Sequence, residues 1–173
     1  RQMCIRDINS TTTPRDLEND LDVWIIQIAL AESVAARLRK HGFKCKTVEI
    51  TVRDNGLYSF SRQIHLRQPT NITNEIVTAA FQLFKDNYKW EHPIRSLGIR
   101  AADLVLDDIP VQLDLFGNQE KKEKLEKLDR TVDEIRRRFG YFSIQRAAMY
   151  QDKVLSHLDA GTHTIHPHSY FHG

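Results

Sequence analysis

Apolar residues recur with a helical period over residues 16–41. Val23, Ile26 and Leu30 fall at three- and four-residue steps, which places them on one stripe of a helix. Acidic residues crowd the first turns of this segment and basic residues the last, as the helix dipole favours, and Gly42 follows as a C-terminal cap. The pattern predicts one amphipathic helix over residues 16–41.

The period then changes to two. Val48, Ile50 and Val52 share one face of residues 47–53, while the polar residues between them share the other. An Asp-Asn-Gly turn follows, and residues 60–67 alternate in the same way. The two runs predict an antiparallel hairpin.

A second helix and a further strand complete the pattern. Residues 73–89 carry an apolar stripe that includes Val77 and Phe84, and a proline closes the segment. Residues 94–104 alternate as a strand, and a weaker signal over residues 5–12 predicts a strand before the first helix.

The resulting β-α-β-β-α-β order predicts an α+β fold, a four-stranded antiparallel or mixed sheet with two helices on one face, over residues 1–110. The other face would stay open, which antiparallel sheets allow. That face would be polar and mildly basic, with Glu49 as its acid; it would carry Thr51, Arg53, Ser61, Gln63, His65, Arg67, Ser96 and Arg100.

Composition narrows the class of protein. The chain has 173 residues and a net charge of +2, so any basic surface must be local. Cys4 and Cys45 lack metal-ligand or redox spacing, which fits a reducing compartment. The longest apolar stretch, residues 23–31, is too short to span a bilayer. We expect a cytoplasmic protein without a membrane partner.

A short peptide after the last predicted strand carries candidate binding chemistry. Gln112, Leu113, Leu115 and Phe116 are spaced so that an extended segment places its apolar side chains in one slot and its amide in a polar one. The peptide resembles the motif by which bacterial DNA polymerases bind the sliding clamp. We call residues 111–117 the clamp peptide; the alternative is a buried terminal strand.

Longer stretches resemble the little-finger domain of bacterial Y-family translesion DNA polymerases, such as DNA polymerase IV and UmuC-like enzymes. They are TPRDL at 13–17, LAESVAARL at 30–38, FSRQ at 60–63 and PIRSLGIR at 93–100, and residues 128–147 resemble a C-terminal extension of some members. One departure is Asn9, where relatives usually carry a glycine. The resemblance implies a module that binds primer–template DNA and the clamp during damage bypass.

The resemblance also implies site residues. Contacts with the DNA backbone are expected from Lys46, Thr51, Arg53, Ser61, Arg62, Gln63, Arg95 and Arg100. Arg62 and Arg95 lie on the inward parity, so an alternative is that they tie strand ends together. Without the family, a solvated polar sheet face is the simpler interpretation. Clamp contacts are expected from Gln112, Leu113, Leu115 and Phe116.

Catalysis is expected elsewhere in the parent polymerase. The family holds two magnesium ions with carboxylates of a palm domain, and no palm sequence is present among these residues. No phosphate-binding loop, nucleophile elbow or metalloprotease helix is present in the sequence either. We therefore expect no catalytic residue, metal site or cofactor in this chain.

Two further segments follow the clamp peptide. Residues 118–140 predict a charged helix whose stripe repeats like a short heptad pattern: Leu125, Leu128, Val132, Ile135 and Phe139. It either packs on its own domain, which we favour, or binds a partner, as in a protein-interaction adaptor without DNA contact. Residues 141–173 predict a mobile tail, with a zinc site as the minority alternative for its histidines: His157, His163, His166, His168 and His172.

Overall fold

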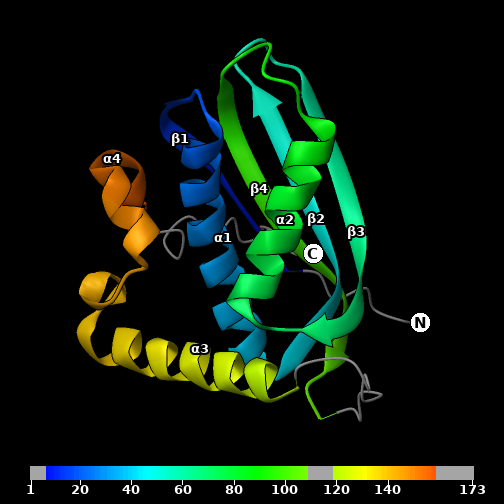
Figure 1. The fold of residues 1–173 in the computed structure, drawn as a ribbon, viewed down its shortest axis with the longest axis vertical. Helices are drawn as coiled ribbons and strands as arrows, with labels where there is room; N and C mark the ends of the chain where they lie inside the picture. The colour runs from blue at the N-terminus through cyan, green and yellow to red at the C-terminus, as the bar shows by residue number, and fades with distance from the viewer. Residues whose placement is uncertain (1–6, 109–118, 159–173) are drawn as a thin grey trace, which may run out of the picture.

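The computed structural model describes residues 7–108 and 119–158 of the chain. The elements in chain order are β1 (Asp7–Leu17), α1 (Asp20–His41), β2 (Phe43–Asp54), β3 (Ser59–Thr70), α2 (Thr73–Asn87), β4 (Ile94–Leu106) and α3 (Gln119–Phe139). Three short helices then follow: η1 (Tyr141–Ser143), η2 (Ala147–Gln151) and α4 (Lys153–Ser156). Figure 1 shows α3 lying across one end of α1 and of the sheet.

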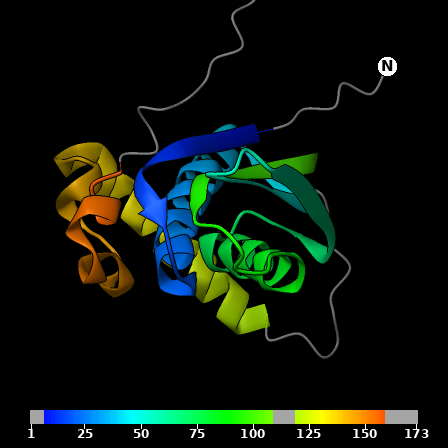
Figure 2. The same ribbon diagram turned by 90° about the horizontal axis from the view of Figure 1, so that it is seen from above.

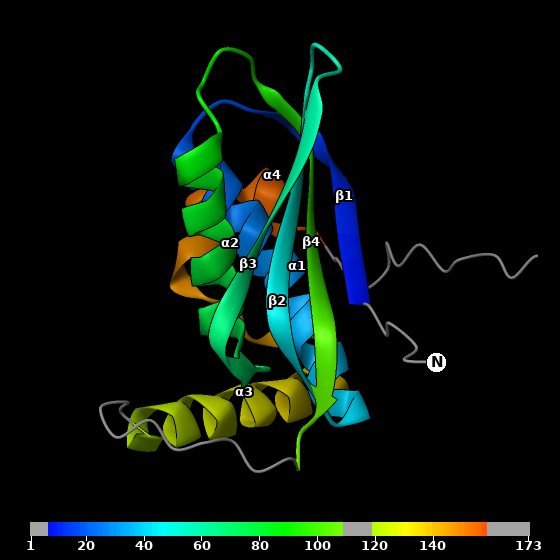
Figure 3. The same ribbon diagram turned by 90° about the vertical axis from the view of Figure 1, so that its right-hand side faces the viewer.

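The four strands form one sheet in the order β1-β4-β2-β3, and every neighbouring pair is antiparallel. Each βαβ unit is therefore split, because β4 lies between β1 and β2, and β2 lies between β3 and β4. Figures 2 and 3 show α1 and α2 on the same side of the sheet. The predicted α+β fold is confirmed.

The core lies between the sheet and the two helices. Ile50 and Ile99 point inward from the central strands and are no more than 1% exposed. They meet Ile26 and Leu30 of α1 and Phe84 of α2, which are buried to the same degree. The alternation predicted for β2 and β4 thus places every second side chain in the core, and the side chains between them lie on the far side of the sheet.

The start of α1 differs from the prediction. The sequence pattern placed it at residue 16, but β1 continues to Leu17, which pairs with Ile94 and is fully buried. The side chain of Asn19 then accepts a hydrogen bond from the Asp22 N–H (2.9 Å), which caps the helix. Asp16, which the sequence pattern assigned to the first turn of the helix, thus lies in β1. The end of α1 is as predicted, with Gly42 in the left-handed region (φ 70°).

Residues 141–158 do not form the mobile tail that we predicted. They fold back along α1 and β1, and the side chains of Met149 and Leu155 are 1% and 0% exposed. Asp152 caps α4 by accepting hydrogen bonds from the Val154 and Leu155 N–H groups. We call residues 141–158 the C-terminal arm. The rest of the predicted tail, residues 159–173, lies outside the described residues.

Acid should loosen the C-terminal arm. Asp152 also accepts a hydrogen bond of 2.7 Å from Arg15, and this bond, followed by that from the Leu155 N–H, lowers the pKa of the carboxyl. A carboxyl whose pKa is lower in the folded state stabilises that state near neutral pH and loses the effect as the pH falls through its folded pKa. We expect the hydrogen-exchange protection factors of residues 153–158, which correct for the slower intrinsic exchange in acid, to fall at acidic pH before the sheet unfolds.

The matching variant is Asp152→Asn, with Asp108→Asn, an exposed site outside the arm, as the control. Asp152→Asn should exchange faster at pH 7 and respond less to acid than the wild type. Unchanged protection in Asp152→Asn would show that the arm does not depend on this ion pair.

Candidate nucleic-acid interface

The face of the sheet opposite α1 and α2 carries no other described element (Figure 3). We call it the open face. Strand register aligns its residues in rows, one of which runs from Ser10 through Gly98 and Thr51 to Ser61. The Thr51 and Ser61 hydroxyls lie 3.1 Å apart. The open face is therefore a continuous polar surface built from all four strands.

Four of the residues predicted to contact DNA lie together on the open face. They are Thr51, Arg53, Ser61 and Gln63, and all are exposed. The Arg53 side chain makes no hydrogen bond or ion pair with the residues that the structure describes. Such an arginine, next to hydroxyl groups, is free to bind an anionic ligand.

Arg100 also lies on the open face, but its charge is already balanced. It forms an ion pair with Glu49 across β2 and β4 at 3.0 Å, and both side chains are less than a quarter exposed. The Arg100 Nε atom is buried without a hydrogen-bond acceptor. Because an ion pair must be disrupted before Arg100 binds another anion, it contributes less to binding than Arg53.

Arg62 and Arg95 already have partners within the described residues. Arg62 donates a hydrogen bond of 3.2 Å to the Asn87 side chain at the end of α2, and its guanidinium lies over the Phe60 ring. Arg95 donates to Asp16 at 3.2 Å. Both arginines join strands to neighbouring segments, which is the alternative that their inward parity left open.

Lys46 is exposed, at the end of the sheet where the pairing of β2 with β3 shifts register between Cys45 and Thr47. Arg67 lies on the outward parity of β3 and is exposed, and its side chain has no hydrogen bond or ion pair within the described part of the chain. The sequence placed Arg67 on the open face but not among the site residues. Its outward position in the alternation of β3 and its positive charge were the sequence features that could have identified it as a site residue.

Gly98 leaves a low point in the middle of the open face. A Cβ atom there would lie 3.1 Å from the Ser10 Cβ and 3.6 Å from the Thr51 Cβ, closer than ordinary packing in the first case. The neighbouring strands therefore leave little room for a side chain at position 98. The same absence exposes main-chain groups to a ligand that lies flat on the sheet.

The clamp peptide, with Gln112, Leu113, Leu115 and Phe116, lies outside the described residues, but both of its flanks are fixed. The Asp107 N–H donates to the Gly42 carbonyl (2.8 Å), and the Asp107 carboxylate pairs with Lys44 (2.6 Å) and Arg130 (2.8 Å). Burial alone would raise the pKa of Asp107, but the two cations outweigh it and hold this pKa below its ordinary value. The peptide thus connects two elements of one folded body, β4 and α3.

Charged side chains dock α3 on its own domain. Arg39 of α1, 8% exposed, donates to Asp133 at 2.6 and 2.9 Å and to Asp129 at 3.2 Å. Asp129 also accepts a hydrogen bond from the Thr73 N–H, at the start of α2. A second group, in which Glu32 pairs with Arg136 and with Arg146 of the C-terminal arm, continues this cluster. Packing of the helix on its own domain is the alternative that we favoured.

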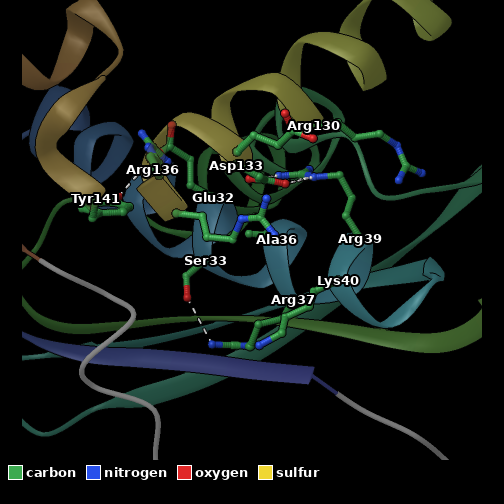
Figure 4. Close-up of a pocket in the computed structure, with 12 residues that line it drawn as sticks. Glu32, Ser33, Ala36, Arg37, Arg39, Lys40, Arg130, Asp133, Arg136 and Tyr141 are labelled. Carbon is green, nitrogen blue, oxygen red and sulfur yellow. Dashed lines mark hydrogen bonds and ion pairs between the residues drawn. The ribbon is translucent and has the colours of Figure 1, made fainter. Parts of the chain in front are cut away.

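The cluster lies beside a cleft between α1 and α3 (Figure 4). The cleft has a volume of about 720 Å³, and Ser33, Ala36, Lys40 and Tyr141 are among its lining residues. The heptad-like stripe of α3 is only partly covered, since Leu128 and Phe139 are 56% and 75% exposed. Polar contacts, more than the apolar stripe, therefore hold α3 in place.

The described residues hold no group of three or more His, Cys, Asp or Glu side chains arranged for a metal ion. Among the same residues, no helix has the length and apolar character that a membrane span requires.

Comparison with known proteins identifies the domain. Residues 8–115 match the family model described as the impB/mucB/samB family C-terminal domain. DNA polymerase IV of Acetivibrio thermocellus is 43% identical over 150 residues, which are 87% of this chain and 38% of that protein. DNA polymerase IV 2 of Bacillus subtilis (strain 168) is 36% identical over 141 residues, 79% of this chain and 33% of that protein.

The chain thus spans less than two-fifths of the length of these relatives. A solved structure, the complex of the beta-clamp processivity factor and the little finger domain of PolIV, aligns with 65% of this chain and 100% of its own, at 14% identity and a TM-score of 0.49. The family assignment rests on the sequence matches, which cover all four strands and both helices of the sheet layer. The chain belongs to the impB/mucB/samB family, and its residues 8–115 correspond to the C-terminal domain of that family's Y-family DNA polymerases.

Proposed function

We propose that this chain binds primer–template DNA through the open face and tethers its polymerase to the sliding clamp through the clamp peptide. The observation that carries the DNA part is the exposed set of Thr51, Arg53, Ser61 and Gln63 on a sheet face that no described helix covers. Hydroxyls, amides and arginines of this kind bind phosphates and fix position without reading base sequence. A damage-bypass polymerase needs such sequence-independent binding.

The catalytic step belongs to the rest of the proposed parent protein. The relatives are DNA polymerases IV, and this chain covers less than two-fifths of their length. The family resemblance implies that the two magnesium ions are held by carboxylates of a palm domain. We infer that this chain contributes substrate binding and partner binding, and that it supplies no catalytic residue. Because DNA and the sliding clamp are found in the bacterial cytoplasm, we propose that this protein acts there.

The clamp part rests on the pentapeptide and on the fixed flanks of the clamp peptide. Burial of Leu115 and Phe116 contributes about 1.5–3 kcal/mol each. Ordering the peptide offsets part of that gain, which leaves a dissociation constant on the order of micromolar. Binding of this strength allows the polymerase to exchange on the clamp.

A second candidate function is a protein-interaction adaptor that uses α3. It is favoured by the exposed apolar side chains of Leu128 and Phe139. An adaptor of this kind would bind a protein partner and would show no salt-dependent affinity for DNA. The dependence of duplex affinity on salt separates the two functions, because phosphate contacts release counterions.

Replacing Arg53 and Arg67 with glutamine should weaken duplex binding in a characteristic way. Each arginine that neutralises one phosphate contributes about 0.9 to the slope of log affinity against log salt. We expect the double variant to lose about two units of slope in a fluorescence-anisotropy titration. Lys127→Gln, an exposed cation on α3, is the control and should leave the slope unchanged. An unchanged slope in the double variant would exclude the open face as the DNA site.

A further inference from the structure

Three strands bring a hydroxyl, an imidazole and a carboxylate together at one end of the open face. Thr47 of β2 is 1% exposed, and its Oγ1 lies 2.7 Å from His65 Nδ1 on β3. The same Oγ1 donates a hydrogen bond of 2.5 Å to Asp103 Oδ2 on β4. The His65 ring itself is exposed, at 72% of its side-chain surface.

These contacts determine which ring nitrogen carries a proton. The Thr47 hydroxyl has one hydrogen, and Asp103 receives it because an ionised carboxylate only accepts. The bond between Thr47 and His65 must then run from the ring, so His65 Nδ1 is the donor. The remaining nitrogen, Nε2, is the one left for a ligand at the open face.

The backbone of β4 is irregular at Asp103, and this irregularity brings the Asp103 side chain to the same end of the open face as Thr47 and His65. Inward positions alternate as Leu97, Ile99 and Ala101, so a regular strand would turn residue 103 toward the core. Asp103 instead has φ 53°, in the left-handed region that few residues other than glycine, asparagine and aspartate adopt. Its carboxylate consequently meets Thr47.

We infer that His65 is a proton-dependent phosphate ligand of the DNA site, a role that rests on the proposed function of the open face. Protonated His65 offers an Nε2–H donor and a positive charge to a phosphate oxygen, whereas neutral His65 presents a lone pair that repels it. The charge of a protonated ring offsets that of the Asp103 carboxylate, which lies 3.9 Å away. When the ring is neutral, the uncompensated carboxylate repels the phosphate.

The charged neighbours do not cancel this effect. Arg67 lies two residues along β3 from His65, and Lys46 is adjacent to Thr47 on β2; both are cations that also attract DNA. Glu49, two residues along β2, is paired with Arg100. The helices face the other side of the sheet (Figure 3). Asp103 is therefore the acid that responds directly to the charge of His65, at 3.9 Å.

Duplex affinity should therefore rise as the pH falls from about 8 to 6, the range in which imidazole gains its proton. We expect a three- to tenfold increase for the wild type, and a salt slope larger by about one unit at the lower pH, since one more phosphate is neutralised. Affinity and slope should change together, because both report the same contact.

The experiment is a fluorescence-anisotropy titration of this chain with a primer–template duplex at both pH values and two salt concentrations. His65→Gln should bind with little dependence on pH, and Thr47→Val should show a reduced dependence because it uncouples His65 from Asp103. His41→Gln, at the end of α1 on the helical side, is the control and should behave as the wild type. NMR of the His65 ring should show its titration midpoint moving to higher pH when duplex is added.

The outcomes separate the two proposals. Duplex binding with the same pH dependence in His65→Gln as in the wild type would overturn the role of His65 and leave the DNA face intact. If no duplex binding is found at either of the two pH values, the proposed function of the open face is overturned. The role of His65 is then overturned with it.

Discussion

Replacing both Leu115 and Phe116 with alanine is expected to abolish clamp binding and to leave duplex binding unchanged. The two side chains together account for about 3–6 kcal/mol of apolar burial in the proposed complex. Since every 1.4 kcal/mol is tenfold in affinity, their loss corresponds to at least about 100-fold. A micromolar dissociation constant would then become about 0.1 mM or weaker, so that surface plasmon resonance or calorimetry at micromolar clamp concentrations would show no binding.

The control for this variant changes residues beside the motif. Val111→Ala with Asn118→Ala changes two positions that flank residues 112–116 but retains the Leu and Phe side chains. It should bind the clamp within about twofold of the wild type. Equal clamp affinity in the Leu115→Ala, Phe116→Ala variant would show that the pentapeptide is not the tether. Loss of duplex binding in the same variant would show that the two activities are not separate.

Arg39→Ala is expected to be the most destabilising single change at the junction of α1 and α3. The variant lacks the guanidinium, which donates hydrogen bonds to Asp133, Asp129 and the Asn71 carbonyl. The two carboxylates then remain in a largely buried site without this cation. Removing one partner of a buried ion pair costs about 3–5 kcal/mol. For a chain of this length that corresponds to a fall of about 6–20 °C in Tm.

Urea unfolding and hydrogen exchange measure this effect. Exchange in α3 should accelerate more than exchange in the central strands, because α3 depends on Arg39 and the strands do not. Arg137→Ala is the matched control, since Arg137 is exposed on α3 and has no ion pair within the described ranges. A change of less than about 1 kcal/mol in Arg39→Ala would contradict the view that charged contacts hold α3 in place.

Periodicity alone predicted the strand and helix order, because alternating residues such as Val48, Ile50 and Val52 leave only one face for the core. It failed at the start of α1. Acidic residues before a helix also occur at the end of a strand, and the pairing of Leu17 with Ile94 is a long-range contact that no local pattern contains. The cap at Asn19 would have been the better local signal.

The C-terminal arm and the docking of α3 were harder to predict for the same reason. Met149 and Leu155 are too sparse to give a period, yet each is buried against the domain. Arg39 and Glu32 looked like ordinary surface charges of a helix, and only the fold shows them facing the acids and arginines of α3. Ion pairs between distant segments leave no pattern in one sequence.

In the candidate DNA site, the sequence predicted the position of some residues but not the ion pair of another. Alternation correctly placed Thr51, Arg53, Ser61 and Gln63 on one exposed surface. It also placed Arg100 there, but the pairing with Glu49 depends on register between β2 and β4, which the sequence does not specify.

The most direct test of the DNA-binding role is the affinity of this chain for a primer–template duplex across a series of salt concentrations. Phosphate contacts by Arg53, Arg67 and their neighbours predict a log–log slope of about −2 to −4. The slope should be the same for duplexes of different base sequence, because the open face binds the backbone. Absence of binding, or an affinity independent of salt, would contradict the account and favour the adaptor function of α3.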